Sequence, residues 1–148
     1  MFDPIEITDK IFISPEITDE DIPAIRDARF AAIVDLRAED RDDEGLVRQA
    51  GMNYLHVDMI DHMNPTTGQV EQILDFVDPL LDSGRKILLH CKNGTGRAPL
   101  MAIAILAHRG MGLARAWSYV EDQVPNIGLT ESQILFLNTD LAAFLGTS

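Results

Sequence analysis

The stretch from Lys86 to Met101 (KILLHCKNGTGRAPLM) contains the side chains needed to hold and attack an oxyanion. Cys91 opens a glycine-bearing loop, and Arg97 closes it where a helix is expected to begin. The first N–H groups of a helix have no partners within the helix and carry partial positive charge, so such a turn can cradle an anion. Arginine adds a planar fork that can bind two phosphate oxygens. We therefore expect this loop to bind a phosphate-like group.

The loop also provides a setting for a reactive thiol. Gly94 and Gly96 can adopt positive φ values that turn successive N–H groups toward one point. Helix N–H groups and nearby positive charge lower a thiol pKa from about 8.5 to roughly 3.5 to 7.5. On composition alone, a single free cysteine is best interpreted as a small core residue. Its position in this loop instead favours Cys91 as a nucleophile.

Two other glycine-rich phosphate loops are excluded by specific positions. A Walker loop needs lysine followed by Ser or Thr, where this chain has Arg97 and Ala98. A dinucleotide fingerprint that begins at Gly94 needs a third glycine where the chain has Pro99. The loop therefore points to phosphate chemistry at the cysteine rather than to nucleotide binding.

The sequence predicts no cofactor and no metal. The single cysteine permits neither an internal disulfide nor a CxxC zinc motif. A zinc site built from His56, His62 and His90 would quench the thiolate. The charged segment 37–44 (RAEDRDDE) does not have the spacing of a calcium loop, and we interpret it as a solvated connector.

Length and charge limit the class of protein. The 148 residues fit a single domain spanning 1–148. The net charge of −12 argues against nucleic acid and anionic membranes as partners. The longest apolar run, 100–107, is too short to span a bilayer, and the N-terminus lacks the basic and apolar regions of a secretory signal. We expect a cytoplasmic protein, and its oligomeric state is left open.

Expected strands and helices alternate along the chain. This alternation predicts a single α/β domain with a central, mostly parallel sheet of about four to five strands flanked by helices. Strands are expected within 5–14 and at 30–36, 52–57 and 86–90. Helices are expected after Thr18, at 46–51, 69–83, 98–108 and 113–124, and from Thr130 onward. Pro79 predicts a kink or break in the third of these helices.

A proton donor for a leaving alkoxide must come from another loop. Asp58 and Asp61 follow the strand expected at 52–57. In open α/β sheets ligands bind outside the carboxyl ends of the strands, so this loop should neighbour the Cys91 loop. Either carboxylate is then a candidate general acid.

The segment from His90 to Arg97 resembles the His-Cys-(x)5-Arg signature of the cysteine-dependent protein phosphatases, in particular the compact dual-specificity branch. Asp61-His62-x-Asn64-Pro65 is similar to the acid loops of its tensin-like members. The resemblance implies a cysteine-phosphatase-like fold, Cys91 as nucleophile and Asp61, in preference to Asp58, as general acid. It implies these phosphate-binding residues: Lys92, Asn93, Gly94, Thr95, Gly96 and Arg97.

The same resemblance implies three supporting residues. His90 would brace the loop, Asn126 would hydrogen-bond to it, and Gln133 would orient the hydrolytic water. An Asn in a turn and a Gln in a first helical turn also need no function. The chain departs from the family at Ala98, where relatives carry a hydroxyl that bonds the cysteine sulfur. Without it we expect slower hydrolysis of the covalent intermediate.

The leading functional hypothesis is a phosphomonoester hydrolase with a phosphocysteine intermediate. Its substrate would be a phosphorylated protein, of the protein-tyrosine or dual-specificity type, or a small phosphoester. Lys92 and the tensin-like loop motivate a phosphoinositide or inositol-phosphate phosphatase as the alternative. A sulfurtransferase has no need for Asp61. A catalytically weak phosphate-binding interaction module is an alternative of another class, but a pure binder needs no nucleophile.

Overall fold

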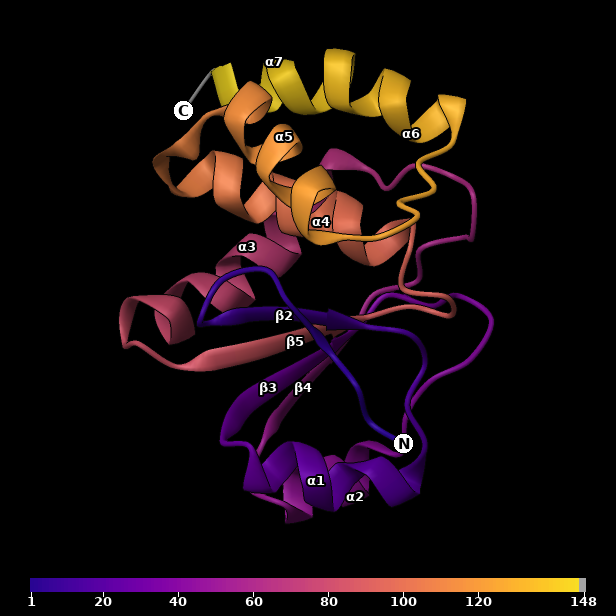
Figure 1. Cartoon of the computed structure of the whole chain (residues 1–148), viewed down its shortest axis with the longest axis vertical. Coiled ribbons are helices and arrows are strands. Elements are labelled where there is room, and N and C mark those ends of the chain that lie inside the picture. The colour runs from indigo at the N-terminus through magenta and orange to yellow at the C-terminus, as the bar shows by residue number, and fades with distance from the viewer. Residues whose placement is uncertain (147–148) are drawn as a thin grey trace.

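A five-stranded sheet with helices on both faces forms the centre of the computed structural model, which describes residues 1–146 (Figure 1). The strands are β1 (Ile5–Glu6), β2 (Ile11–Ser14), β3 (Phe30–Asp35), β4 (Asn53–His56) and β5 (Lys86–His90). Their order across the sheet is β1-β2-β5-β3-β4. Only the β1–β2 pair is antiparallel, so the predicted mostly parallel α/β sheet is confirmed.

The helices form two layers, one on each face of this sheet. Helices α1 and α2 cover one face, and α3 to α7 cover the other (Figure 1). The helices and helical turns are η1 (Asp19–Asp21), α1 (Ile22–Asp27), α2 (Glu44–Gln49), α3 (Thr67–Asp82), α4 (Arg97–Leu106), η2 (Ala107–Met111), α5 (Leu113–Gln123), α6 (Glu131–Phe136), η3 (Leu137–Leu141) and α7 (Ala142–Gly146).

Helix α3 follows directly from its capping residues. Thr66 accepts a hydrogen bond from the Gln69 N–H, and the Gln69 side chain returns one to the Thr66 N–H, so the helix begins at Thr67. The helix continues through Pro79 to Asp82, so of the predicted kink or break the break is absent and the kink stays a prediction. Proline removes one hydrogen bond close to the C-terminal end, where the apolar stripe already holds the helix on the core. The buried residues of that stripe are Val70, Ile73, Leu74 and Val77.

Alternation along the strands decides which side chains reach each layer. In β3, Ala32 and Val34 pack in the core under α3 to α7, whereas Ile33 packs in the core under α1 and α2. The same period in β5 leaves His90 on the α1 and α2 side, and the next residue, Cys91, joins the core under α3 to α7. The two halves of the His-Cys pair thus belong to different layers.

Three loops meet at the carboxyl ends of the parallel strands. They are the 37–44 segment after β3, the Asp61 loop (58–65) after β4 and the Cys91 loop (91–96) after β5. The interpretation of 37–44 as a solvated connector is wrong, because Arg37 and Asp42 are buried. The segment folds back against the end of β5, which is the neighbour of β3. No helix in the described part of the chain is long and apolar enough to cross a membrane.

Candidate active site

The Cys91 loop is shaped by close backbone contacts. Gly94 has φ +74°, and a Cβ placed there would lie 2.9 Å from the backbone nitrogen of Pro15, so only glycine fits. The Glu16 N–H donates to the Lys92 carbonyl at 2.9 Å, which ties the loop to the chain just after β2. Gly96 has φ −125°, so the expected positive φ occurs only at the first of the two glycines.

Arg97 begins α4 and turns its guanidinium, 1% exposed, toward the other two loops. Two of its nitrogens donate to the two carboxylate oxygens of Glu39, at 2.7 and 2.8 Å. One of these nitrogens also donates to the carbonyl oxygens of Met59 (2.8 Å) and Leu36 (3.3 Å). The third nitrogen, Nε, has no hydrogen-bond partner among the described residues, and a carboxylate oxygen of Asp61 lies 3.5 Å from it.

The charges around this guanidinium stabilise one another. Burial opposes the charged form of Arg97, but the hydrogen bonds to Glu39 and the negative charges of Cys91, Asp61 and Glu39 raise its pKa overall. The hydrogen bonds from Arg97 in turn lower the pKa of Glu39 to about 2, although burial works in the other direction. Glu39 is therefore an ionised, fixed partner of Arg97 at neutral pH.

The structure distinguishes between the two candidate carboxylates of the Asp61 loop. A cavity of about 390 Å³ lies between the three loops and is lined by Ala38, Glu39, Ile60, Asp61 and Lys92, the last of which belongs to the Cys91 loop. The Asp61 side chain is 35% exposed and lies beside Arg97 at this cavity. Asp58 is 73% exposed and lies 3.3 Å from the Nε2 of His56 instead. Of the two, Asp61 is the one that lines this cavity and lies beside Arg97, and its role as general acid stays a prediction.

His90 lies in a buried polar network on the opposite face of the sheet. Its Nε2 is 2.6 Å from a carboxylate oxygen of Asp42, whose backbone N–H donates to Asp35 at 3.0 Å. Tyr54 donates its hydroxyl to the same Asp35 carboxylate at 2.8 Å. Burial alone would raise the pKa of Asp35, but the hydrogen bond from Arg37 and the charge of His90 lower it overall. His90 thus bonds to the 37–44 segment, its Nδ1 has no hydrogen-bond partner among the described residues, and its role as a brace of the Cys91 loop stays a prediction.

This network also contains three groups that could ligate a metal. Ligand atoms of Asp35, Asp42 and His90 lie within 4.8 Å of one another. However, the Arg37 guanidinium already donates to both carboxylates, at 2.9 to 3.1 Å. The charges of the Asp35 and Asp42 carboxylates are thus already paired with the Arg37 guanidinium, and this group of side chains does not favour a metal ion.

The segment after α5 contacts the Cys91 loop from the side of α6. The Gly128 N–H donates to the Thr95 carbonyl at 2.7 Å. Gln133 is buried, and its amide lies 3.7 Å from the position of a Cβ on Gly96. The same amide donates to the Met63 carbonyl at 3.3 Å. Asn126 is exposed, with φ +59°, so the bond seen from this segment to the loop comes from Gly128 and the role of Asn126 stays a prediction.

Two residues of the site, Glu39 and Asp42, were missed in the sequence because their segment is so densely charged. A signal for them was present, since 37–44 follows a strand and loops after parallel strands share one edge of the sheet. A buried arginine and a buried histidine at the neighbouring strand end would then need carboxylates as partners. Glu39 and Asp42 bind Arg97 and His90. The site then combines the Cys91 thiol, the buried guanidinium of Arg97, whose Nε has no hydrogen bond among the described residues, and the partly exposed carboxylate of Asp61. Such a set can bind a tetrahedral anion and exchange a proton with it.

Solved structures with the same fold are phosphatases or resemble them. Tk-PTP in its active form is 24% identical, with a TM-score of 0.84 over 95% of this chain and 96% of its own. PTPMT1 in complex with PI(5)P is 16% identical, with a TM-score of 0.85 and 95% of both chains covered. A human tyrosine phosphatase-like serine/threonine/tyrosine-interacting protein is 21% identical, with a TM-score of 0.79 over 96% and 97%. These likenesses establish the fold.

The sequence itself supplies the family. None of the curated proteins matches it. The family model described as "Polymorphic toxin system, DSP-PTPase phosphatase" (Tc-R-P) matches residues 10–111, from just before β2 to the end of η2. This range is more than half of the chain and contains all three loops of the site. The protein therefore belongs to the DSP-PTPase phosphatases of polymorphic toxin systems, within the cysteine phosphatase superfamily.

Proposed function

We propose that the protein hydrolyses phosphomonoesters through a phosphocysteine intermediate, with Cys91 as nucleophile, Arg97 as phosphate ligand and Asp61 as general acid. One observation carries this proposal: the buried Nε of Arg97 lacks a hydrogen-bond partner among the described residues and lies 3.5 Å from Asp61, beside the Cys91 loop. An unpaired buried donor is costly, so a ligand oxygen that accepts from it is strongly favoured.

The orientation of Arg97 suits a phosphate ligand. Glu39 occupies the edge of the guanidinium formed by its two terminal nitrogens. The remaining edge, which includes Nε, faces Asp61 and is free to donate to phosphate oxygens. Glu39 thus fixes the arginine without taking the donors that the phosphate needs.

The chemistry then proceeds in two balanced steps. The Cys91 thiolate attacks phosphorus, an S–P bond forms, the ester P–O bond breaks, and Asp61 gives its proton to the leaving oxygen. In the second step Asp61 takes a proton from water, the water oxygen bonds to phosphorus, and the S–P bond breaks. The products are inorganic phosphate and the regenerated thiolate. Arg97 and the loop N–H groups stabilise the charge on the transferred group throughout.

The rim of the cavity favours a phosphotyrosine substrate over an inositol phosphate. The cationic side chain that lines the cavity is Lys92, whereas exposed carboxylates of Glu16, Asp40 and Asp58 adjoin the lining segments. These carboxylates would repel a ring that bears several phosphates. Ile60, 64% exposed, offers an apolar surface at the cavity for an aromatic ring.

Hydrolysis of an aryl phosphate tests the mechanism. We expect Cys91→Ser to abolish turnover and Asp61→Asn to reduce kcat by about 10²- to 10⁴-fold. Asp58→Asn is the matched control, because it neutralises an exposed carboxylate of the same loop, and its rate should stay near wild type. Mass spectrometry of an acid-quenched reaction should find the added phosphoryl group on the peptide that contains Cys91. Equal rates in all variants would refute the enzymatic proposal, and a loss in Asp58→Asn alone would transfer the acid role to that residue.

Substrate preference needs a separate comparison. The wild-type protein should hydrolyse a phosphotyrosine peptide faster than a phosphatidylinositol phosphate presented in mixed micelles. The opposite ranking would favour the phosphoinositide alternative.

A further inference from the structure

We propose that the first turn of α6 fixes the Asp61 loop in place over the Cys91 loop, so that Thr130 and Ser132 are positioning residues for the Asp61 carboxyl group. This inference rests on the proposed function, because it takes Asp61 as the general acid. It assigns a role to two hydroxyl groups that do not themselves line the cavity beside Asp61 and Lys92.

Three side chains of this turn bind three consecutive residues of the Asp61 loop. The Thr130 hydroxyl donates to the His62 carbonyl at 2.9 Å. The Ser132 hydroxyl donates to the Asn64 side-chain oxygen at 2.6 Å. Between them, the Gln133 amide donates to the carbonyl of Met63. The end of the Asp61 loop is thus held from one side by a single helical turn that lies far away in the sequence.

The same segment also holds the Cys91 loop. Gly128, two residues before Thr130, donates its N–H to the Thr95 carbonyl. Gln133 packs beside Gly96 with the amide that also reaches the Asp61 loop. Because one short segment bonds to both loops, it sets the distance between the thiol of one and the carboxylate of the other.

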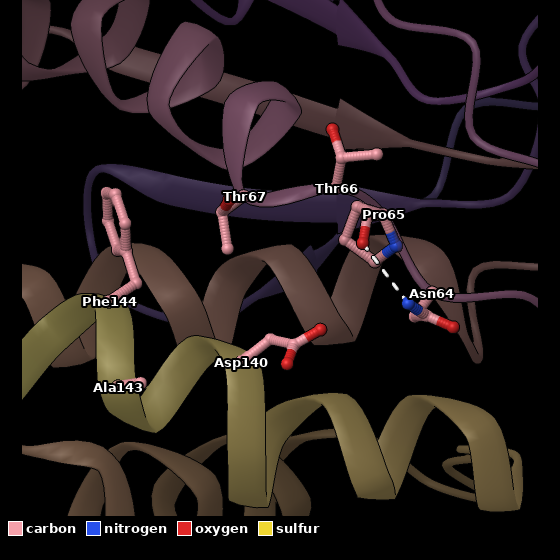
Figure 2. A pocket seen from close by; sticks show the side chains of 7 residues that line it. All are labelled: Asn64, Pro65, Thr66, Thr67, Asp140, Ala143 and Phe144. Carbon is pink, nitrogen blue, oxygen red and sulfur yellow. Dashed lines mark hydrogen bonds between the residues drawn. The ribbon is translucent and has the colours of Figure 1, made fainter.

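Packing alone does not fix residues 62–64 of the Asp61 loop, which are all exposed. The Met59 side chain is buried, and its carbonyl accepts from Arg97 and from the Ala38 N–H, so the beginning of the loop is anchored. Farther along, Ile60, His62 and Met63 are exposed. Beyond them a hollow of about 590 Å³ separates the loop from the C-terminal helix (Figure 2). Its walls are Asn64, Pro65, Thr66 and Thr67 on one side and Asp140, Ala143 and Phe144 on the other. Hydrogen bonds from α6 therefore hold residues 62–64, which lie between the buried Met59 and the buried Pro65.

Loss of these bonds should affect one part of the reaction selectively. A displaced Asp61 protonates the leaving oxygen less well, whereas thiolate attack and phosphate binding depend on the Cys91 loop and Arg97. A poor leaving group needs that proton and a good one does not. One hydrogen bond corresponds to a rate effect of about two- to tenfold.

The test compares two aryl phosphates whose leaving groups differ widely in pKa, such as phenyl phosphate and dinitrophenyl phosphate. Ser132→Ala should lower kcat/KM for phenyl phosphate about two- to tenfold, and Thr130→Val/Ser132→Ala by more than either single change. Both variants should keep kcat/KM for dinitrophenyl phosphate, which does not include breakdown of the phosphocysteine, within about twofold of wild type, and this is below the effect of a lost hydrogen bond. Thr130→Ser keeps the hydroxyl, so its ratio of kcat/KM for phenyl phosphate to kcat/KM for dinitrophenyl phosphate should equal that of wild type.

Two comparisons make the result decisive. Thr18→Val removes a hydroxyl that donates to Asp21 at the start of η1, on the α1 side of the sheet, and should leave the ratio of the two rates unchanged. Asp61→Asn should show the largest dependence on the leaving group. If it shows none, the assignment of the acid fails, and the inference with it. If Asp61→Asn shows the dependence while the Thr130 and Ser132 variants lose both activities equally or not at all, only the inference is overturned.

Discussion

Arg37 and Arg97 are both almost fully buried, at 3% and 1% exposure, yet their surroundings differ in one respect. Carboxylates lie within ion-pair distance of all three nitrogens of Arg37; they belong to Glu16, Asp35, Asp40 and Asp42. The same is true of Arg97, with Glu39 at two nitrogens and Asp61 at 3.5 Å from Nε. The difference lies in the hydrogen bond of Nε: that of Arg37 donates to Asp35 at 2.9 Å, whereas that of Arg97 has no hydrogen bond within the described residues. A buried arginine whose Nε is bonded within the fold stabilises that fold, whereas one whose Nε is not bonded can donate to a ligand.

We expect the largest effect on activity from a substitution of Arg97. Arg97→Lys keeps the charge but replaces the planar fork with a point charge that cannot serve Glu39 and a phosphate together. We expect kcat/KM for an aryl phosphate to fall by about 10³-fold, as for loss of a transition-state donor. Circular dichroism should show the wild-type fold. A variant that keeps more than a tenth of the activity would mean that Arg97 is a structural arginine like Arg37.

Arg37 should show the opposite behaviour. Arg37→Met leaves the carboxylates of Asp35 and Asp42 buried without their cation, which should lower the free energy of unfolding by about 3 to 5 kcal/mol. Urea unfolding at pH 7 measures this loss. Arg26→Met is the control, because Arg26 is exposed, and its change should stay within about 0.5 kcal/mol. Equal stability of the two variants would show that the buried network contributes nothing.

Glu39 links the two environments through pH. Its pKa is about 2 in the folded protein, against 4.5 normally, so its contribution is complete above pH 4.5 and is lost as the pH falls toward 2. Because the side chain is 39% exposed, solvent screening reduces this contribution to about 1 kcal/mol. Glu39→Gln should therefore be less stable than wild type at pH 7, and the difference should shrink between pH 4.5 and 2. A difference that stays constant down to pH 2 would contradict the charge-assisted bond to Arg97.

A substitution of Ala98, next to Arg97, tests whether the site lacks a hydroxyl that would hydrogen-bond to the Cys91 sulfur. It is fully buried and has no hydroxyl to offer the cysteine sulfur. Ala98→Ser should speed breakdown of the phosphocysteine by about threefold, the effect of one hydrogen bond. Rapid mixing should show a burst in wild type that becomes smaller in the variant. Wild-type turnover without a burst would mean that breakdown of the intermediate does not limit the rate.

The local parts of the site could be predicted from the sequence. The strand, the Cys91 loop and α4 are consecutive, so a motif with its flanking periodicity was enough to place them. Asp61 could be placed because it follows a strand. The partners of Arg97 and His90 could not, because Glu39 and Asp42 reach them only when β3 lies beside β5, and the order of strands is not encoded in local periodicity.

The C-terminal segment shows a second limit. The pattern Thr130-x-x-Gln133 predicted a helix start, and the structure has that capping box. The pattern cannot reveal that the same hydroxyl also donates to a carbonyl 68 residues earlier. A capping motif satisfies its own helix, so a further tertiary use of its side chain leaves no trace in the spacing.

The contact between Gly94 and the backbone at Pro15 has a consequence for how far the molecule can be shortened. The backbone just after the N-terminal β1–β2 hairpin packs against the Cys91 loop, and the hydrogen bond from the Glu16 N–H to the Lys92 carbonyl holds the two segments together. Removing residues 1–16 would remove these contacts from a loop that lies more than half the chain away in sequence. A minimal catalytic fragment made of β5, the loop and α4 would therefore lack the template that gives the loop its shape.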